Sequence, residues 1–140
     1  MASLNFNSGI RSALTGGINF SSDSFKMLLV GAAPGETEKD GWDFRSNVTG
    51  EITGTGYTAG GSAVTLTVAA TDDVNNRVDI TAGAVAWPSS TITAAAAVIY
   101  KDTGNAATDQ LVCSIDFGGN VSSTNDTFTV TPSGQLRFQN

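Results

Sequence analysis

The sequence predicts an all-β protein, an antiparallel β-sandwich or jelly roll with at most one short N-terminal helix. Only 14% of the 140 residues are charged, against about 25% in an average soluble protein. Thr, Ser, Asn and Gly take the place of the missing charges, and this composition favours strands over exposed helices. Apolar residues recur at every second position. Turn-forming clusters follow one another at intervals of about 8 to 15 residues, among them "WPSS" (87–90) and "GGNVSSTND" (118–126). That spacing is typical of a sandwich and not of alternating βαβ units.

The one expected helix lies in "NSGIRSALTGG", residues 7–17. Ser8 could cap its start, Ile10 and Leu14 lie four residues apart, and Gly16 could end it. We assign residues 1–23 to an N-terminal arm that could serve as a docking segment. Residues 24–140 form a single β-sandwich domain in this interpretation, and residues 32–45 its loosest surface loop.

Period-two alternation predicts the strands. The segment "SFKMLLV" (24–30) is apolar on both faces, which indicates a central strand. The run "TITAAAAVIYKD" (91–102) is ambiguous because alanines favour helix, but its flanking β-branched residues favour the strand that we expect. The other predicted strands are 63–69, 77–80, 111–117, 127–132 and 135–138.

A glycine-rich stretch, "EITGTGYTAGGSAVTL" (51–66), raises the question of phosphate binding. Gly54, Gly56 and Ala59 fit a loose dinucleotide fingerprint, which requires a following helix to hold the pyrophosphate. A threonine-alternating strand follows instead, and no Lys-Ser or Lys-Thr completes a P-loop. We therefore expect a bend around Tyr57 and a tight turn at Gly60-Gly61.

We assign no catalytic, cofactor-binding or metal-binding residues and expect no enzyme activity. The chain has no histidine and a single cysteine, Cys113, whose place in an apolar alternation predicts a buried core residue. The acidic run "TDDVNNRVD" (71–79) could offer oxygen ligands to Ca²⁺, but the closing Glu of a calcium loop is absent. A hairpin turn is the preferred interpretation. The remaining acidic candidates are expected to be solvated: Glu36, Glu38, Asp40, Glu51, Asp102 and Asp116.

The net charge of −6 and the pI of about 4.2 disfavour direct binding to nucleic acid, because phosphates would be repelled. No basic run for anionic lipid and no apolar stretch of spanning length occurs in the sequence. The first residues lack the pattern of a secretory signal. We therefore expect assembly in the cytoplasm and no membrane partner.

Four aromatic residues, Trp42, Phe44, Tyr57 and Trp87, leave three interpretations open. On a sandwich they could belong to the core, line a subunit interface, or form a platform for carbohydrate.

Four segments in order carry a resemblance to a known class of proteins. They are "SFKMLLV", "NVTGEITGTGYTAGG", "VAWPSSTITAAAAVIYKDTG" and "LVCSIDFGGNVSSTNDTFTV". The "GTGYTAGG"-type bend, the alanine-rich strand ending in "AVIY", and the late "DFG" resemble small virion proteins of tailed bacteriophages. The resemblance spans roughly residues 24–131.

This resemblance implies a capsid decoration, or cement, protein. Such proteins are typically β-sandwiches or jelly rolls on the outer face of the capsid, assembled in the host cytoplasm. The implied partners are the major capsid protein and the chain itself, as a homodimer or homotrimer. An alternative is a receptor- or carbohydrate-binding module of a phage fibre or tail tip, which would be present in far fewer copies.

Six apolar residues are candidate interface contacts because their segments look too short to bury them alone: Phe6, Ile10, Trp42, Phe44, Leu136 and Phe138. Deleting residues 1–12 is then expected to abolish docking and leave the fold intact.

Overall fold

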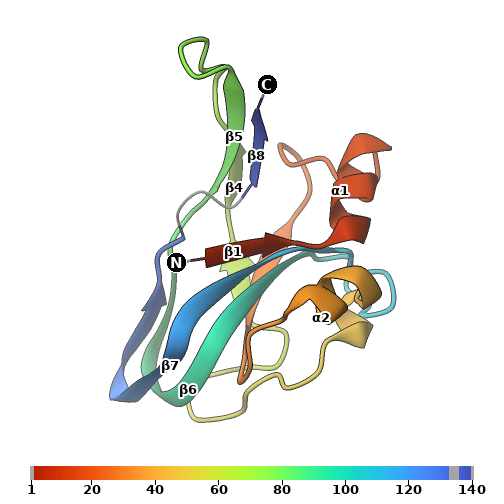
Figure 1. Ribbon diagram of the computed structural model, residues 1–140. Coiled ribbons are helices and arrows are strands. Elements are labelled where there is room, and N and C mark those ends of the chain that lie inside the picture. The colour runs from red at the N-terminus through yellow and green to blue at the C-terminus, as the bar shows by residue number, and fades with distance from the viewer. Residues whose placement is uncertain (1, 133–135, 140) are drawn as a thin grey trace.

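The computed structural model describes residues 2–132 and 136–139, and it is built mostly of strands (Figure 1). The elements in chain order are β1 (Ala2–Asn5), α1 (Asn7–Leu14), β2 (Phe25–Val30), α2 (Glu36–Gly41), the 3₁₀ turn η1 (Arg45–Asn47), β3 (Ser62–Val64), β4 (Leu66–Val68), β5 (Arg77–Ala82), β6 (Val85–Lys101), β7 (Leu111–Val130) and β8 (Leu136–Gln139). The all-β prediction is confirmed.

The strands form two antiparallel sheets. The large sheet has the order β1-β7-β6-β2-β3, and the small sheet has the order β4-β5-β8. The chain passes directly between them, since only Thr65 separates β3 from β4. The single strand predicted for residues 63–69 is therefore wrong, because this segment is divided between the two sheets. In Figure 1 the small sheet projects from the body beside α1, with the C-terminus near its outer end. The predicted central strand is confirmed, because β2 is paired on both sides, with β6 and β3.

The β6–β7 hairpin is a long ribbon with several bulges. Residues 117–120 of β7 lie opposite the single residue between Ala94 and Ala96 of β6. Such bulges bend a ribbon and increase its twist, and Figure 1 shows the ribbon turning at its lower left corner. The clusters "WPSS" and "GGNVSSTND" were expected to be turns, and that prediction is wrong. They lie within β6 and β7, because bulges use the same small and polar residues as turns.

The large sheet buries both of its faces. On one face the core contains Phe6, Leu28, Val30, Ala96, Val98, Tyr100 and Leu111, with Trp42 and Val48 packed against it. The opposite face carries the larger cluster, which includes Met27, Leu29, Trp87, Ile115 and Phe128. The small sheet joins this second cluster through Leu66, Ile80 and Leu136. The alanine-rich run is a strand, as predicted, and its residues Ala94, Ala96 and Ala97 are fully buried.

The N-terminal segment is part of this fold. β1 pairs with β7 from Ala2 opposite Asp116 to Asn5 opposite Cys113. The predicted helix is confirmed as α1, but Ser8 does not cap it, because the helix begins at Asn7 and the hydroxyl of Ser8 donates to the Trp42 carbonyl. A side chain at Gly9 would overlap the carbonyl oxygen of Leu111 in β7. Residues 2–14 therefore form an edge strand and a helix packed on the sheet. The expectation that residues 1–12 can be removed without disturbing the fold does not agree with this arrangement.

A second short helix, α2, lies in the segment that was expected to be a surface loop. None of its six residues is buried. The segment therefore has no helical repeat of apolar residues that could have indicated a helix. The backbone N–H of Gly35 donates to the Glu38 carboxylate at 2.8 Å, which caps its first turn. Lys39 forms an ion pair with Glu36 on its surface.

Candidate interaction surface

The small sheet has one apolar face and one charged face. Cross-strand pairs place Val68 opposite Ile80, Ile80 opposite Leu136, and Val78 opposite Phe138. Directly paired residues share a face of a sheet, so the apolar side chains of β4, β5 and β8 all lie on one side. The intervening residues, Thr67, Arg77, Asp79, Thr81, Arg137 and Gln139, lie on the other.

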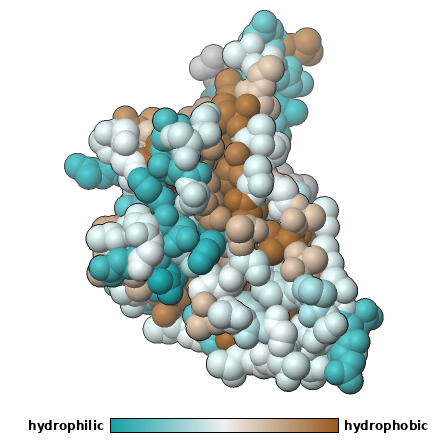
Figure 2. Space-filling view, turned by 180° about the vertical axis from the view of Figure 1, so that it is seen from behind, coloured by the Kyte–Doolittle hydropathy of each residue, from teal (hydrophilic) through white to brown (hydrophobic). Residues whose placement is uncertain are grey.

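The apolar face changes from buried to exposed along its length. Near the body, Leu66, Ile80 and Leu136 are buried in the core. Toward the outer end, Val68 and Phe138 each keep 43% of their surface exposed. Figure 2 shows an apolar band that runs from the projecting sheet into the middle of the molecule. The apolar face of the small sheet therefore extends beyond the part that the rest of the chain covers.

The charged face is held together by ion pairs. Arg137 Nε donates to Asp79 Oδ1 at 2.7 Å, and this bond is the main cause that lowers the pKa of Asp79. Arg77 Nε lies 3.2 Å from Asp72 Oδ2 and 3.5 Å from Asp79 Oδ2, without the angle of a hydrogen bond to either. Hydrogen bonds from Asn75 are the main cause that lowers the pKa of Asp72. The arginines on this face are therefore already occupied by neighbouring carboxylates.

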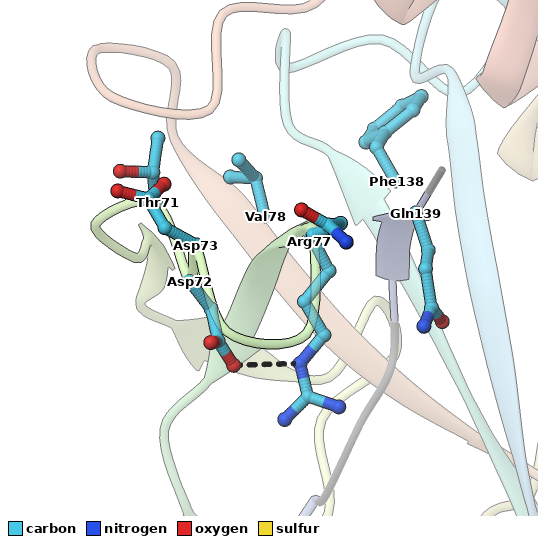
Figure 3. Close-up of a pocket in the computed structure, with 8 residues that line it drawn as sticks. Thr71, Asp72, Asp73, Arg77, Val78, Phe138 and Gln139 are labelled. Carbon is cyan, nitrogen blue, oxygen red and sulfur yellow. Dashed lines mark ion pairs between the residues drawn. The ribbon is translucent and has the colours of Figure 1, made fainter.

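The β4–β5 connection confirms the predicted hairpin turn. It is closed by reciprocal backbone bonds between Asp72 and Arg77. Beside it lies an open hollow of about 480 Å³, lined by Thr71, Asp72, Asp73, Asn76, Arg77, Val78, Phe138 and Gln139. In Figure 3 Val78 and Phe138 point to one side of the sheet, while Arg77 and Gln139 point to the other. Within residues 2–132 and 136–139, no three Asp, Glu, Cys or His side chains gather in a way that could hold a metal ion.

The glycine-rich stretch is a bend fixed by a polar network. Glu51 Oε1 accepts hydrogen bonds from Tyr57 Oη at 2.7 Å and from the Gly60 N–H at 2.6 Å. Tyr57 Oη also accepts from the Leu29 N–H of β2 at 3.0 Å. Tyr100 Oη donates to the Gly60 carbonyl at 2.6 Å. Burial, as the first cause, raises the pKa of Tyr57 and raises the pKa of Tyr100 to about 12, so both act as neutral hydroxyl groups.

Two of its glycines are required by close packing. Gly56 has φ +81°, and a Cβ there would lie 2.8 Å from Ser90 Cα in β6. Gly61 has φ +77°, and a Cβ there would overlap the carbonyl oxygen of Met27 in β2. The bend leads into β3 and not into a helix. The predicted bend and the turn at Gly60-Gly61 are confirmed, and the carboxylate of Glu51, expected to be solvated, is instead bonded within this bend.

A second polar cluster holds the loop between β6 and β7. The fully buried Asp109 accepts from Arg45 Nε at 2.7 Å and from the backbone and hydroxyl of Thr103, both at 2.7 Å. Burial alone would raise the pKa of Asp109, but the bonds from Thr103 and Arg45 outweigh it and lower the pKa. The Arg45 guanidinium also lies 5.3 Å from the centre of the Tyr100 ring. These contacts stabilise the loop between β6 and β7.

The four aromatic residues do not gather at one end of the molecule. Trp87 is buried and lies 6.1 Å from the Tyr57 ring on one face of the large sheet. Trp42 packs on the other face, stacked on Phe6 with ring centres 6.3 Å apart. Phe44 is half-buried. For Trp42, Tyr57 and Trp87, core packing is the interpretation that the structure supports. Cys113 is buried as expected, and burial raises the pKa of its thiol to about 12.

The six predicted interface residues separate by burial. Phe6 and Leu136 are buried in the chain's own core, at 0% and 5% exposure. Their short segments do not bury them alone, because residues from other elements complete the burial. Phe138 is exposed on the small sheet, and the other three are half-buried: Ile10, Trp42 and Phe44. An interface role stays a prediction for all of them. Residues 133–135, which precede Leu136, lie outside the described residues.

The sequence pattern indicated neither Val68 nor Val78 as a candidate contact. It placed Val68 on the apolar face of its strand and predicted that Val78 is buried, whereas Val68 is 43% exposed and Val78 is half-buried. Alternation marks the apolar face of a strand but not how far the rest of the chain covers it. Comparisons with known protein families, with curated proteins and with solved structures gave no match. In the part of the chain that the structure describes, no helix has the length and apolar character needed to cross a membrane.

Proposed function

We propose that this chain is a non-enzymatic structural protein of a tailed-bacteriophage particle. In this role it decorates the outer surface of the capsid and stabilises the shell by bridging neighbouring copies of the major capsid protein. The proposal starts from the sequence resemblance described above. The observation that carries it further is the small sheet, whose apolar face extends beyond the body that buries the core.

The geometry of the described residues supports a role in binding another protein better than a role in catalysis. The polar clusters around Glu51 and Asp109 hold loops against the large sheet. The carboxylates of both residues already accept hydrogen bonds from within the chain. Among the described strands, β4 and β8 are the two edges of the small sheet, and sheet edges can add to a neighbouring sheet. A shell is strengthened by many weak contacts repeated by symmetry, and each contact need not be strong by itself.

A binding test with particles examines this proposal. Purified particles that lack the chain would be mixed with the purified protein, separated by sedimentation, and analysed for bound copies. The expected result is saturable binding in a constant ratio to the major capsid protein, with a higher temperature of DNA release. Binding confined to fibres or tail tips would support the alternative of a receptor- or carbohydrate-binding module, and absence of binding would refute decoration.

A further inference from the structure

The last part of β7 is an edge of the large sheet that no described strand covers. Among the described strands, β1 is the one that pairs with the outer side of β7, and it reaches only from Cys113 to Asp116. Residues 117–130 pair with β6 on the other side. Figure 1 shows this end of β7 as the blue arrow at the left margin of the molecule. An uncovered strand presents backbone N–H and C=O groups, and the partner that satisfies a row of such groups is another extended strand.

Bulges limit where a strand can be added to this edge. β7 contains extra residues at 117–120 and again between Ser123 and Asp126. Bulges of this kind interrupt the row of backbone groups and protect an edge from other chains. From Asp126 to Val130, β7 has no bulge of its own. We therefore expect an added strand to pair with residues 126–130 and not with the whole edge.

An apolar hollow of about 140 Å³ opens beside this stretch. It is lined by Phe117, Val121, Phe128, Thr129 and Val130. All of these residues belong to β7, so the hollow lies at the outer edge of the β6–β7 ribbon and not over its middle. Val121 is 45% exposed. An apolar cavity of about 150 Å³ can hold a benzene molecule, so the hollow has room for one branched aliphatic side chain.

Charge favours a basic segment as the added strand. Asp126 lies two positions before Phe128, and alternate residues of a strand share a face. Its carboxylate accepts the Thr127 N–H at 2.7 Å and forms no ion pair with a Lys or Arg among the described residues. The chain carries a net charge of −6, which attracts a segment that bears a Lys or Arg and repels a second copy of this acidic chain.

We propose that residues 126–130 of β7 bind an extended segment of another polypeptide by strand addition. The segment pairs with the backbone of β7 and places one aliphatic side chain in the hollow beside Phe128. It places a Lys or Arg two positions away, against Asp126, because directly opposed residues of antiparallel strands share a face. This site goes beyond the proposed function, since it is defined by the chemistry of the bound segment and not by the particle that supplies it.

Titration of the isotope-labelled full chain with a synthetic peptide tests this site. The probe is Thr-Lys-Thr-Val-Thr-Lys-Thr with blocked termini, in which the Val and both Lys residues share one face of a strand. We expect saturable amide shifts concentrated in residues 117–130, at peptide concentrations up to about 5 mM. A charge-reversed peptide, with Glu in place of both Lys residues, should bind at least about threefold more weakly.

Variants of exposed residues separate the two contacts. Val121→Lys places a charged side chain in the hollow and should abolish binding of the basic probe. Val121→Thr guards against a folding defect in that variant and should weaken binding by about threefold. Asp126→Asn keeps an acceptor for the Thr127 N–H and should weaken binding by about twofold to fivefold. The matched controls are Val74→Lys and Asp73→Asn in the exposed β4–β5 hairpin, which should leave binding unchanged.

Three results would overturn the proposal. The first is the absence of saturable shifts in residues 117–130 with the basic probe. The second is binding that Val121→Lys and Val121→Thr both leave unchanged. The third is equal binding of the basic and the charge-reversed peptides, which would refute a basic segment as the occupant. Because the probe is an isolated peptide, these outcomes do not depend on whether the chain decorates a capsid.

Discussion

Replacing Phe6 with alanine should destabilise the whole domain. The Phe6 side chain is fully buried, between β1 and α1, and stacks on Trp42. Its backbone N–H donates to the Val112 carbonyl of β7 at 3.1 Å. Removing a buried phenyl ring costs about 3–5 kcal/mol through lost burial and the cavity left behind. Against a typical total of about 5–15 kcal/mol, the free energy of unfolding should fall by at least about a fifth, and the melting temperature by about 10 °C or more.

Urea denaturation followed by tryptophan fluorescence and by circular dichroism would measure this loss. The matched control is Leu14→Ala in the same N-terminal segment, because Leu14 is 70% exposed and should change stability by less than about 0.5 kcal/mol. A loss below about 1 kcal/mol for Phe6→Ala would refute the reasoning, since it would mean that residues 2–14 are not part of the cooperative fold. The same reasoning predicts that deleting residues 1–12 yields an unstable protein, because β7 loses its edge partner.

Three further predictions concern the polar and glycine contacts. Gly61→Ala should prevent correct folding, because the added Cβ would overlap the Met27 carbonyl. The control is Gly104→Ala, because Gly104 has φ +84° but lies in open space. That variant should lose only about 1 kcal/mol of stability, measured by thermal unfolding. Tyr57→Phe should lose about 1–3 kcal/mol in urea denaturation, because a backbone N–H and a carboxylate lose their common partner; an unchanged midpoint would contradict this. The folded-state pKa of Asp109 is lowered, so its contribution is complete above its unfolded pKa of about 3.9 and is lost as the pH falls through the lower folded value. Asp109→Asn should therefore flatten the acid side of the stability profile, and an unaltered acid slope would count against the assignment.

The alternation of apolar and polar residues predicted much of the fold. The pattern in residues 63–69 and 77–80 correctly placed the apolar side chains of β4 and β5 on one face. The two-sided apolar character of residues 24–30 correctly indicated a central strand. These predictions worked because side-chain direction in a strand is a local property of the backbone.

Other features depend on contacts that the local sequence does not encode. The residues "FGGN" at 117–120 have the composition of a turn, and only their pairing with β6 shows that they form a bulge. The burial of Phe6 depends on Trp42, 36 positions away, which no local pattern links to it. Likewise, the exposure of Val68 depends on how far the body extends over the small sheet. Of the six candidate interface residues, Phe138 is the one that the structure leaves exposed, and an interface role stays a prediction.

Under the phage origin that we propose, the most direct test of the function is the number of copies of this chain in purified phage particles. Quantitative mass spectrometry would measure that number against the major capsid protein in the same sample. Decoration of the capsid predicts a fixed ratio of the same order as the capsid protein itself, since every equivalent site on the shell is occupied. A few copies per particle, or none, would contradict the account and would point to a tail tip, a fibre or a role outside the particle.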